Sequence, residues 1–467
     1  MQTTWTRREM LQTVAALASA PVLAGRAAAL PRIGIVGAGM AGVSLAWMLD
    51  GNYDVTLIEA APAIGGNVRG VDVDLDGHQF VVDVGAQFFH PGPYPVYTAL
   101  LSSLGLFPPV SGSNEGSHAF PASITVAAQG TALPRFLSPV IPDRSWPILA
   151  PWNSAGTAAF ASLFTAARLR EQFNASWSLT LGDWLPTLGL TQAQWEGILL
   201  PWAASLFSGS IEQARGLSAR AAMIFAARAL PANPLDPLLY YVLTPGMGEV
   251  LRRLLEQSPG VQLKTSAAVQ SVSTDVTGAY QLQCADGSTV TVDQLVFASS
   301  GPATLQLLAM LPGTADQIAA LQGVEFHDAR LVLHTDPIYA PSHPLFYSFL
   351  NCAIDGAHCE ASMWMAPVIA GVPSTTTAKL WKSWTTHRPQ QPAQVLHDTT
   401  FKHMLPTPST IAAQNGLRAL QGRDGIWFAG GYTLPYDAQE TALLSALSVA
   451  LGLGASSARV RGLAHAR

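Results

Sequence analysis

The chain has very few cysteines. Its 467 residues include only Cys284, Cys352 and Cys359, and an odd number of thiols cannot be paired completely within one chain. A fold held together by a disulfide framework is therefore excluded. Cys352 and Cys359 could pair if the chain between them folds back, but we expect all three to be unpaired small residues of the core.

Metal-binding patterns are also missing from the sequence. There is no CxxC or HxxxH spacing, and the histidines, among them His334, His358 and His403, are scattered along the chain. Structural and catalytic metal sites usually bring such ligands together at short, regular spacings. The sequence therefore predicts no metal cofactor.

Charge is scarce as well. Charged residues make up 12% of the chain and the net charge is −5, which leaves no basic surface for a nucleic acid. In contrast, 49% of the residues are hydrophobic, enough to bury a large core in about two or three domains. These values exclude a disordered protein and favour a neutral or apolar small molecule as the partner.

No hydrophobic run is long enough for a confident membrane span. The most apolar N-terminal stretch, residues 11–24, is interrupted by polar residues and a proline. It follows Arg7 and Arg8, and this arrangement resembles a twin-arginine export signal with a small-residue cleavage site at residues 27–29. We predict that residues 1–29 are such a signal, which engages the export machinery and leads to a periplasmic or otherwise exported protein. The alternative is a basic tail on a short buried helix.

A glycine-rich motif begins directly after this segment. Residues 32–42 read RIGIVGAGMAG, and a second hydrophobic segment at residues 53–59 ends in an acid. In a nucleotide-binding strand, turn and helix, Gly37 would allow the tight turn, Gly39 the close approach of a pyrophosphate, and Gly42 the packing of helix on strand. The following helix, expected at about residues 41–49, would point its N-terminus at the phosphates.

The acid that ends the second segment narrows the choice of nucleotide. A carboxylate at the position of Glu59 accepts hydrogen bonds from ribose hydroxyls and repels a 2′-phosphate. The sequence therefore favours an unphosphorylated adenosine ribose, as in FAD or NAD, over NADP.

Two further segments resemble the FAD-binding flavoproteins of the amine oxidase superfamily. A Gly65-Gly66 turn follows the acid-ended strand, and a strand then runs into the Asp-x-Gly pattern of residues 83–85. In that superfamily the Gly-Gly turn passes close to the FAD phosphates. The segment that corresponds to residues 85–87 passes near the isoalloxazine ring.

The C-terminal region resembles the same superfamily independently. Residues 425–433 are predicted to form a buried strand that ends in glycines, and an apolar helix is expected at residues 439–453. In the superfamily, this element meets the pyrophosphate, ribityl chain and flavin. Within it, the order of motifs is most similar to bacterial proteins described only as NAD/FAD-binding or amine-oxidase-like.

The resemblance implies FAD as the cofactor and a set of residues that hold it. These are Gly37, Gly39, Met40, Ala41, Gly42, Glu59, Gly66, Asn67, Gly85, Ala86, Val269, Gly430, Gly431, Thr441 and Ala442. The chain departs from the family pattern at three of them: Asn67 replaces an arginine, Gly431 an acidic residue and Ala442 a glycine. Most contacts at these places use backbone, so we expect FAD binding to persist without covalent attachment.

The implied fold is α/β. A Rossmann-like, glutathione-reductase-like FAD-binding domain with a mixed sheet would comprise residues 30–90, 244–300 and 410–467. It would be interleaved with an α+β substrate-binding domain of residues 91–243 and 301–409. The helical cap of the second domain should include helices near residues 155–169 and 217–230, with its tryptophans in the core.

Catalytic residues are harder to place. Amine oxidases of the superfamily commonly have a lysine on a substrate-domain strand, where it holds a water near flavin N5, and two aromatic rings around the amine. The candidates here are Gln87, Arg330, Trp364, Lys382 and Tyr432. We expect Lys379 and Lys382 to be surface lysines.

The leading hypothesis is an exported FAD-dependent oxidoreductase, amine-oxidase-like, that oxidises a largely apolar small molecule by hydride transfer to flavin N5 and passes electrons to oxygen or another acceptor. A flavin-dependent isomerase or desaturase of unsaturated lipids is the second. A non-enzymatic, flavin-loaded binding protein is the third. A nicotinamide dehydrogenase is disfavoured because no second nucleotide fingerprint is present.

Overall fold

The computed structural model describes residues 30–110, 115–140, 143–231, 233 and 236–467. The predicted export signal, residues 1–29, lies outside the described residues. Within them, no helix combines the length and apolar character that a membrane crossing requires.

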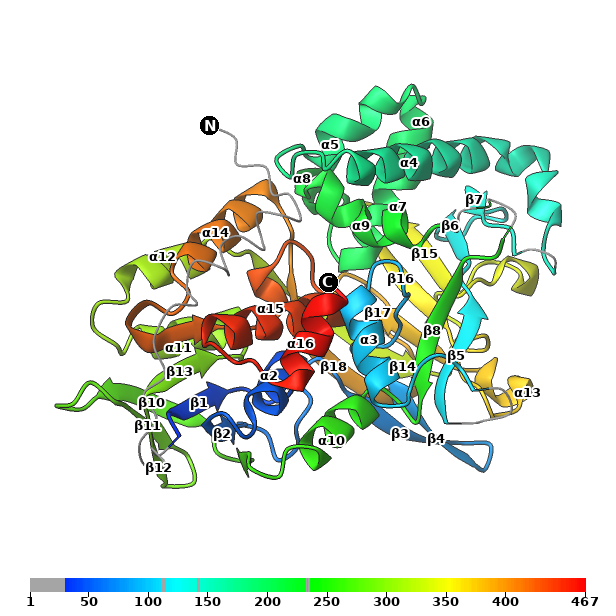
Figure 1. Cartoon of the computed structure of the whole chain (residues 1–467). Helices are drawn as coiled ribbons and strands as arrows, with labels where there is room; N and C mark the ends of the chain where they lie inside the picture. Colours follow the sequence, from blue (N-terminus) through cyan, green and yellow to red (C-terminus); the bar gives the residue numbers. More distant parts are fainter. Residues whose placement is uncertain (1–29, 111–114, 141–142, 232, 234–235) are drawn as a thin grey trace.

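A five-stranded parallel sheet forms the first half of the molecule (Figure 1). Its strand order is β19-β13-β1-β2-β9, and every neighbouring pair is parallel. The bounds are β1 Arg32–Val36, β2 Asp54–Ile58, β9 Gln262–Lys264, β13 Gln294–Phe297 and β19 Ile426–Phe428. Because these strands come from three distant stretches of chain, the sheet forms only when the whole chain folds.

Helices cover one face of this sheet. All ten residues of α2, Met40–Leu49, are buried, because the helix lies between the sheet and α15, Gln439–Gly452. Figure 1 shows α3, Pro95–Ser103, and α16, Ala458–His465, beside α15. The sequence prediction of helices at residues 41–49 and 439–453 is confirmed to within one residue at each end.

The other face carries a three-stranded antiparallel sheet. It consists of β10 Val269–Thr274, β11 Tyr280–Cys284 and β12 Thr289–Val292. Its side chains pack directly on β1, where Gly34 leaves room: a Cβ there would lie 3.0 Å from Leu282 Cδ1 and 3.2 Å from Val292 Cγ1.

A seven-stranded, mostly antiparallel sheet forms the second half. Its order is β18-β14-β17-β16-β15-β6-β7. The bounds are β6 Ile124–Ala128, β7 Phe136–Leu137, β14 Phe326–His334, β15 Leu350–Asp355, β16 His358–Trp364, β17 Trp381–Trp384 and β18 Val395–Met404. Two antiparallel pairs of strands accompany it. One is the hairpin of β3 Gly70–Leu75 with β4 His78–Asp83, and the other pairs two distant segments, β5 Gly116–Pro121 and β8 Leu239–Thr244.

A block of helices packs on this second sheet. Figure 1 shows α4, α7 and α9 above β15 and β16, and α7 contacts both strands. The block comprises α4 Ser154–Gln172, α5 Leu181–Trp184, α6 Gln192–Gln194, α7 Leu200–Phe207, α8 Ile211–Gly216 and α9 Ala219–Ala229. The other α-helices in the described part of the chain are α10 Gly248–Glu256, α11 Gly301–Leu308, α12 Ala315–Gln322, α13 Ser374–Thr377 and α14 Pro408–Ala419.

The core of this block follows the sequence expectation in part. Trp184 and Trp202 are buried in the cluster between helices and sheet. Trp177 and Trp195 are only half-buried, each beneath an arginine guanidinium.

All three cysteines are buried and unpaired, which confirms the prediction that they are unpaired residues of the core. The observed mixture of parallel and antiparallel sheets confirms the α/β class, while the division into two domains stays a prediction.

The packing of α2 predicts opposite effects for two helical glycines. A Cβ on Gly42 would overlap the carbonyl oxygen of Gly37, whereas a Cβ on Gly462 in α16 meets nothing within 4 Å. We expect Gly42→Ala to destabilise the fold by about 1–3 kcal/mol through overpacking. Gly462→Ala should stabilise it by up to about 1 kcal/mol, since alanine favours helix. Denaturant unfolding of both variants measures this, and a neutral Gly42→Ala would contradict the packing.

Candidate functional site

The first glycine turn lies at the carboxyl edge of the parallel sheet. Gly37 has φ +108°, and a Cβ there would lie 2.7 Å from the carbonyl oxygen of Ala298. Its N–H donates to the Ile58 carbonyl at 2.8 Å. Only glycine fits this position, because the chain turns from β1 into α2 close to the backbone that follows the neighbouring strands β2 and β13.

The second glycine turn packs against the first, backbone on backbone. Gly65 donates its N–H to the Ala38 carbonyl at 2.9 Å and forms a bridge with Gly39. Gly66 has φ +59°, and a Cβ on it would lie 3.3 Å from the Gly39 Cα. The two turns together form a surface of main chain with almost no side chains, as the close approach of a pyrophosphate requires.

The N-terminus of α2 opens on this surface without a cap. Its N-cap residue, Gly39, has no side chain to accept a hydrogen bond, and no acidic residue occupies the first turn. The first N–H groups of a helix have no partners within the helix and attract anions. This cradle therefore fits a diphosphate.

Glu59 follows the end of β2 and reaches back to the first turn. One carboxylate oxygen accepts from the Ala38 N–H at 2.8 Å and the other from the Ala61 N–H at 2.9 Å. A carboxylate can accept about four hydrogen bonds in all. Glu59 is thus oriented by two backbone donors and retains the capacity to accept further hydrogen bonds. Its role toward an adenosine ribose stays a prediction.

The C-terminal element lies at the same edge of the sheet. Gly430 follows β19 with φ +142°, and its N–H donates to the Ser445 Oγ of α15 at 2.7 Å. In α15, the carboxylate of Glu440 turns away from its own helix and accepts from the Val96 N–H at 3.1 Å and the Tyr97 N–H at 2.7 Å. It therefore caps α3, and burial raises its pKa to about 7.

The remaining predicted cofactor residues lie around these turns. Ala86 donates its N–H to the Asn67 carbonyl at 2.8 Å, and a Cβ on Gly85 would overlap that same carbonyl. Val269 begins β10, and Thr441 lies buried in the first turn of α15. Met40 and Ala41 form the first turn of α2, and Ala442 follows Thr441. The role of each of these residues toward a cofactor stays a prediction.

Lys382 is buried, which corrects the expectation of a surface lysine. Its relative exposure is 1%, and Nζ donates to the Asp83 carbonyl at 3.1 Å and to the Gln87 Oε1. Burial lowers its pKa to about 7. The sequence could not show this, because Lys382 lies on β17, an interior strand between β14 and β16. Lys379 is exposed and pairs with Asp76 at 2.7 Å, as expected.

Asp83 and an aromatic residue, Phe88, belong to the same stretch of chain as Gln87. The Asp83 carboxylate is buried, accepts from the Met247 N–H at 3.0 Å, and has a pKa raised by burial to about 7. Phe88, next to Gln87, stacks on Tyr240 with ring centroids 5.3 Å apart. It also meets Phe349 edge-on at 5.4 Å. Sequence reasoning missed these rings, although the pair Phe88-Phe89 directly after Gln87 was a usable signal.

The other catalytic candidates do not join this group. Arg330 pairs with Asp398 at 2.5 Å. Trp364 donates its Nε1–H to the Ala378 carbonyl at 2.9 Å and is aligned with Trp381, so it faces away from Lys382. Tyr432 packs beside Phe326 in the core near β13 and β19. Of the five candidates, the structure brings together Gln87 and Lys382.

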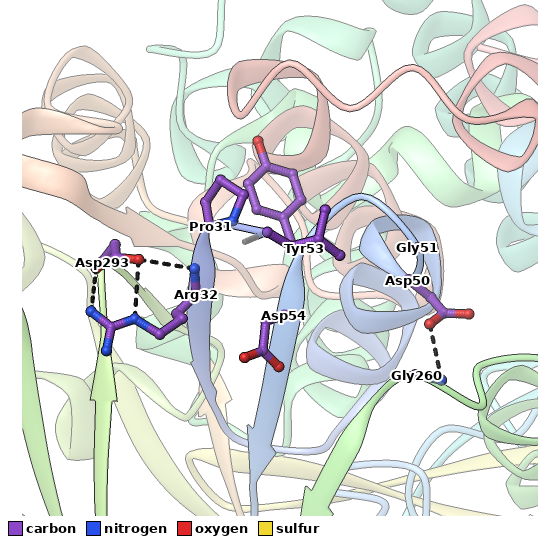
Figure 2. A pocket seen from close by; sticks show the side chains of 9 residues that line it. Pro31, Arg32, Asp50, Gly51, Tyr53, Asp54, Gly260 and Asp293 are labelled. Carbon is purple, nitrogen blue, oxygen red and sulfur yellow. Dashed lines mark hydrogen bonds and ion pairs between the residues drawn. The ribbon is translucent and has the colours of Figure 1, made fainter. Parts of the chain in front are cut away.

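The hollow in Figure 2 lies elsewhere. It has a volume of about 510 Å³ and lies at the amino ends of β1 and β2, where Arg32 bonds to Asp293 and the Gly260 N–H donates to Asp50 (Figure 2). Ligands of open parallel sheets bind at the carboxyl ends of the strands. We therefore do not assign the cofactor to this hollow.

The buried carboxyl group of Asp83 predicts a specific pH dependence of stability. Its pKa is about 7 in the folded chain against 3.8 ordinarily, so its contribution to stability is present below pH 4 and is lost as the pH rises through 7. In Asp83→Asn this loss should disappear. Relative to wild type, the variant should gain stability as the pH rises from 4 to 7. The gain should be about 1.4 kcal/mol for each unit by which the pKa of Asp83 in the folded chain exceeds its ordinary value.

Denaturant unfolding of Asp83→Asn and wild type across this pH range measures the gain. Asp72→Asn, at an exposed carboxyl group on β3, is the matched control and should follow wild type. Parallel stability curves for Asp83→Asn and wild type would contradict a perturbed Asp83.

Comparisons with known proteins agree with this geometry. The family model described as flavin containing amine oxidoreductase matches residues 40–329, well over half of the chain. A search of curated proteins finds no match. Among solved structures, the chain is similar to a protein from Exiguobacterium sp. 255-15 assigned as a protoporphyrinogen oxidase, with 16% identity, TM-score 0.62, and coverage of 92% of this chain and 100% of that one.

Two further structures share the fold. A fatty acid isomerase from P. acnes that produces CLA has 12% identity and TM-score 0.62, and the match covers 89% of this chain and 97% of that chain. A redesigned putrescine oxidase has 14% identity and TM-score 0.59, with coverage of 92% and 100%. The family model, together with a glycine cradle that fits a dinucleotide, leads to one conclusion: the chain belongs to the flavin-containing amine oxidoreductase family and is an FAD-dependent oxidoreductase.

Proposed function

We propose that this enzyme oxidises a largely apolar small-molecule amine, with Lys382 as the residue that handles the proton. The observation that carries the proposal is the buried Lys382 amine, held by Gln87 and by the main chain of Asp83. Bound FAD would supply a hydride acceptor. The glycine turns, the α2 N-terminus and Glu59 would hold the diphosphate and the adenosine ribose.

The lysine suits amine oxidation because of its protonation state. An amine substrate loses hydride from carbon only when its nitrogen carries a free electron pair, so a proton must first leave the ammonium form. Burial brings the pKa of Lys382 to about 7, which makes it a neutral proton acceptor near neutral pH. Gln87 orients the amine of Lys382, because its side-chain oxygen accepts a hydrogen bond from Nζ.

A second candidate is the isomerisation of unsaturated lipids. Phe88 and Tyr240 stack on each other with an interplanar angle of 10°, so these two rings leave no gap to hold an amine between them. The similar fold of a fatty acid isomerase also supports this alternative. A non-enzymatic flavin-loaded protein has less support, because Lys382 supplies a group that can accept a proton.

The visible spectrum of the purified holoenzyme, followed anaerobically, tests the proposal. We expect amines to bleach the oxidised flavin band, because they transfer two electrons to it. If the band persists while double bonds move in added unsaturated fatty acids, the isomerase alternative replaces amine oxidation. Bleaching by unsaturated lipids and not by amines would also contradict the amine proposal.

Lys382→Met sharpens this test. In wild type, kcat/KM should rise with pH through about 7, because the neutral form of Lys382 accepts the proton. The variant should lose this rise and about 10²–10⁴-fold in rate, the usual contribution of a general base. Lys379→Met, which removes an exposed lysine nearby, is the control and should keep the wild-type profile. An unchanged profile in Lys382→Met would exclude the proposed role.

We further propose that the enzyme is exported through its twin-arginine segment. The support is the sequence of residues 1–29, with Arg7 and Arg8 before an apolar stretch. Replacement of both arginines by lysine should retain the protein in the cytoplasm, because this export route depends on the arginine pair. Cell fractionation followed by immunoblotting measures retention, and unchanged export of the variant would contradict the signal.

A further inference from the structure

Five large apolar side chains of the described part of the chain lie exposed on three loops. They are Leu133, Trp146, Ile148, Leu149 and Leu345, and their relative exposures range from 40% for Trp146 to 86% for Leu149. We call these five residues the loop patch. Folded proteins seldom leave groups of large apolar side chains in water, and such groups usually mark a site of interaction.

The three loops are joined into one surface. The Ser342 Oγ of the third loop donates to the Ala132 carbonyl of the first at 2.8 Å. In the second loop, Trp152 meets Trp146 at 6.4 Å and Phe346 of the third loop at 6.0 Å between ring centroids. The second loop then leads directly into α4 (Figure 1). The exposed side chains therefore belong to a single region at the N-terminal end of this helix.

These loops carry no charged side chain of Asp, Glu, Lys or Arg. Their sequences are QGTALP at residues 129–134, SWPILAPWN at residues 145–153 and YAPSHPLFYSF at residues 339–349. Asp143 and Arg144, just before the second loop, have opposite signs. Protein partners usually contribute about one hydrogen bond per 100–200 Å² of interface and favour arginine, whereas the interior of a bilayer rejects charge. The charge pattern therefore matches lipid.

The backbone of the loop tips also suits lipid. Ile148 and Leu149 donate their N–H groups to carbonyls three residues earlier, at 3.1 and 3.0 Å. The Leu345 N–H donates to the ring of His343 at 3.2 Å. Water would satisfy these donors on an ordinary exposed loop, but in lipid each donor needs a partner within the protein. The tips of the second and third loops meet that requirement at their most exposed residues.

We propose that the loop patch docks the enzyme on a lipid bilayer, with Ile148 and Leu149 among the acyl chains. Trp146 would lie at the level of the headgroups, where tryptophan is enriched in membrane proteins. Because the loops are uncharged, attachment depends on apolar insertion and not on anionic lipids. The proposal does not depend on which substrate the enzyme oxidises.

Sedimentation of the full-length holoenzyme with phosphatidylcholine vesicles tests the proposal. We expect wild type to bind equally at low and high salt, because screening weakens only charge interactions. Leu149→Ser should lower the partition coefficient about tenfold, since it removes an inserted aliphatic side chain. Phe173→Ser is the matched control: Phe173 is 80% exposed but lies at the opposite end of α4, and its variant should bind as wild type does.

Quenching by brominated phosphatidylcholine locates the contact. Trp146 should be quenched in wild type, and Trp146→Phe should remove this quenched component of the fluorescence while the enzyme still binds. Every variant retains residues 1–29, so this segment cannot account for differences between them.

Three results would overturn the proposal. The first is vesicle binding by Leu149→Ser equal to that of wild type. The second is binding that requires anionic lipid and disappears in high salt, because that result indicates a charged surface elsewhere. The third is an enzyme that ignores vesicles but self-associates, with Leu149→Ser abolishing the self-association, which would assign the loop patch to a second copy of the chain.

Discussion

The close approach of two glycine turns is the constraint on which the rest of the structure depends. Gly37 and Gly42 allow α2 to begin directly against β1, and Gly65 and Gly66 bring a second loop onto Gly39 with main chain alone. A single added Cβ at Gly37 or Gly42 would overlap backbone that cannot move without shifting a strand or helix. The position of the α2 N-terminus, and so the site of any diphosphate, follows from this packing.

Buried charged residues are a second feature of the structure. The chain has few charged residues, yet Lys382, Asp83 and Glu440 all lie in the interior. Glu440 is satisfied by two backbone N–H groups of α3 and thus joins two helices on one face of the parallel sheet. Burial also moves the pKa values of Lys382 and Asp83 to about 7. Groups that can exchange a proton near pH 7 are typical of active sites.

Those two groups also link the halves of the molecule. Asp83 ends β4, which leads back to the glycine turns through Gly85, whereas Lys382 comes from the middle of the seven-stranded sheet. The Lys382 amine donates hydrogen bonds to the Asp83 carbonyl and to Gln87. These bonds join the half that contains the glycine turns to the seven-stranded sheet on which the helical block packs. The proposed proton transfer at Lys382 would therefore require that both halves be folded.

The sequence by itself determined the parts of this protein that use local backbone geometry. From the sequence we predicted, to within a few residues, the turn before α2, the strand that precedes Glu59 and the glycine-ended strand before α15. Such predictions succeed because turns and helix starts depend on neighbours in the chain. Only the tertiary structure decided which of Lys379 and Lys382 is buried, and that Trp364 and Tyr432 lie apart from Gln87. The physical reason is that burial and side-chain contact depend on strands and loops distant in sequence, and a lysine in an interior strand has the same local pattern as one at the surface.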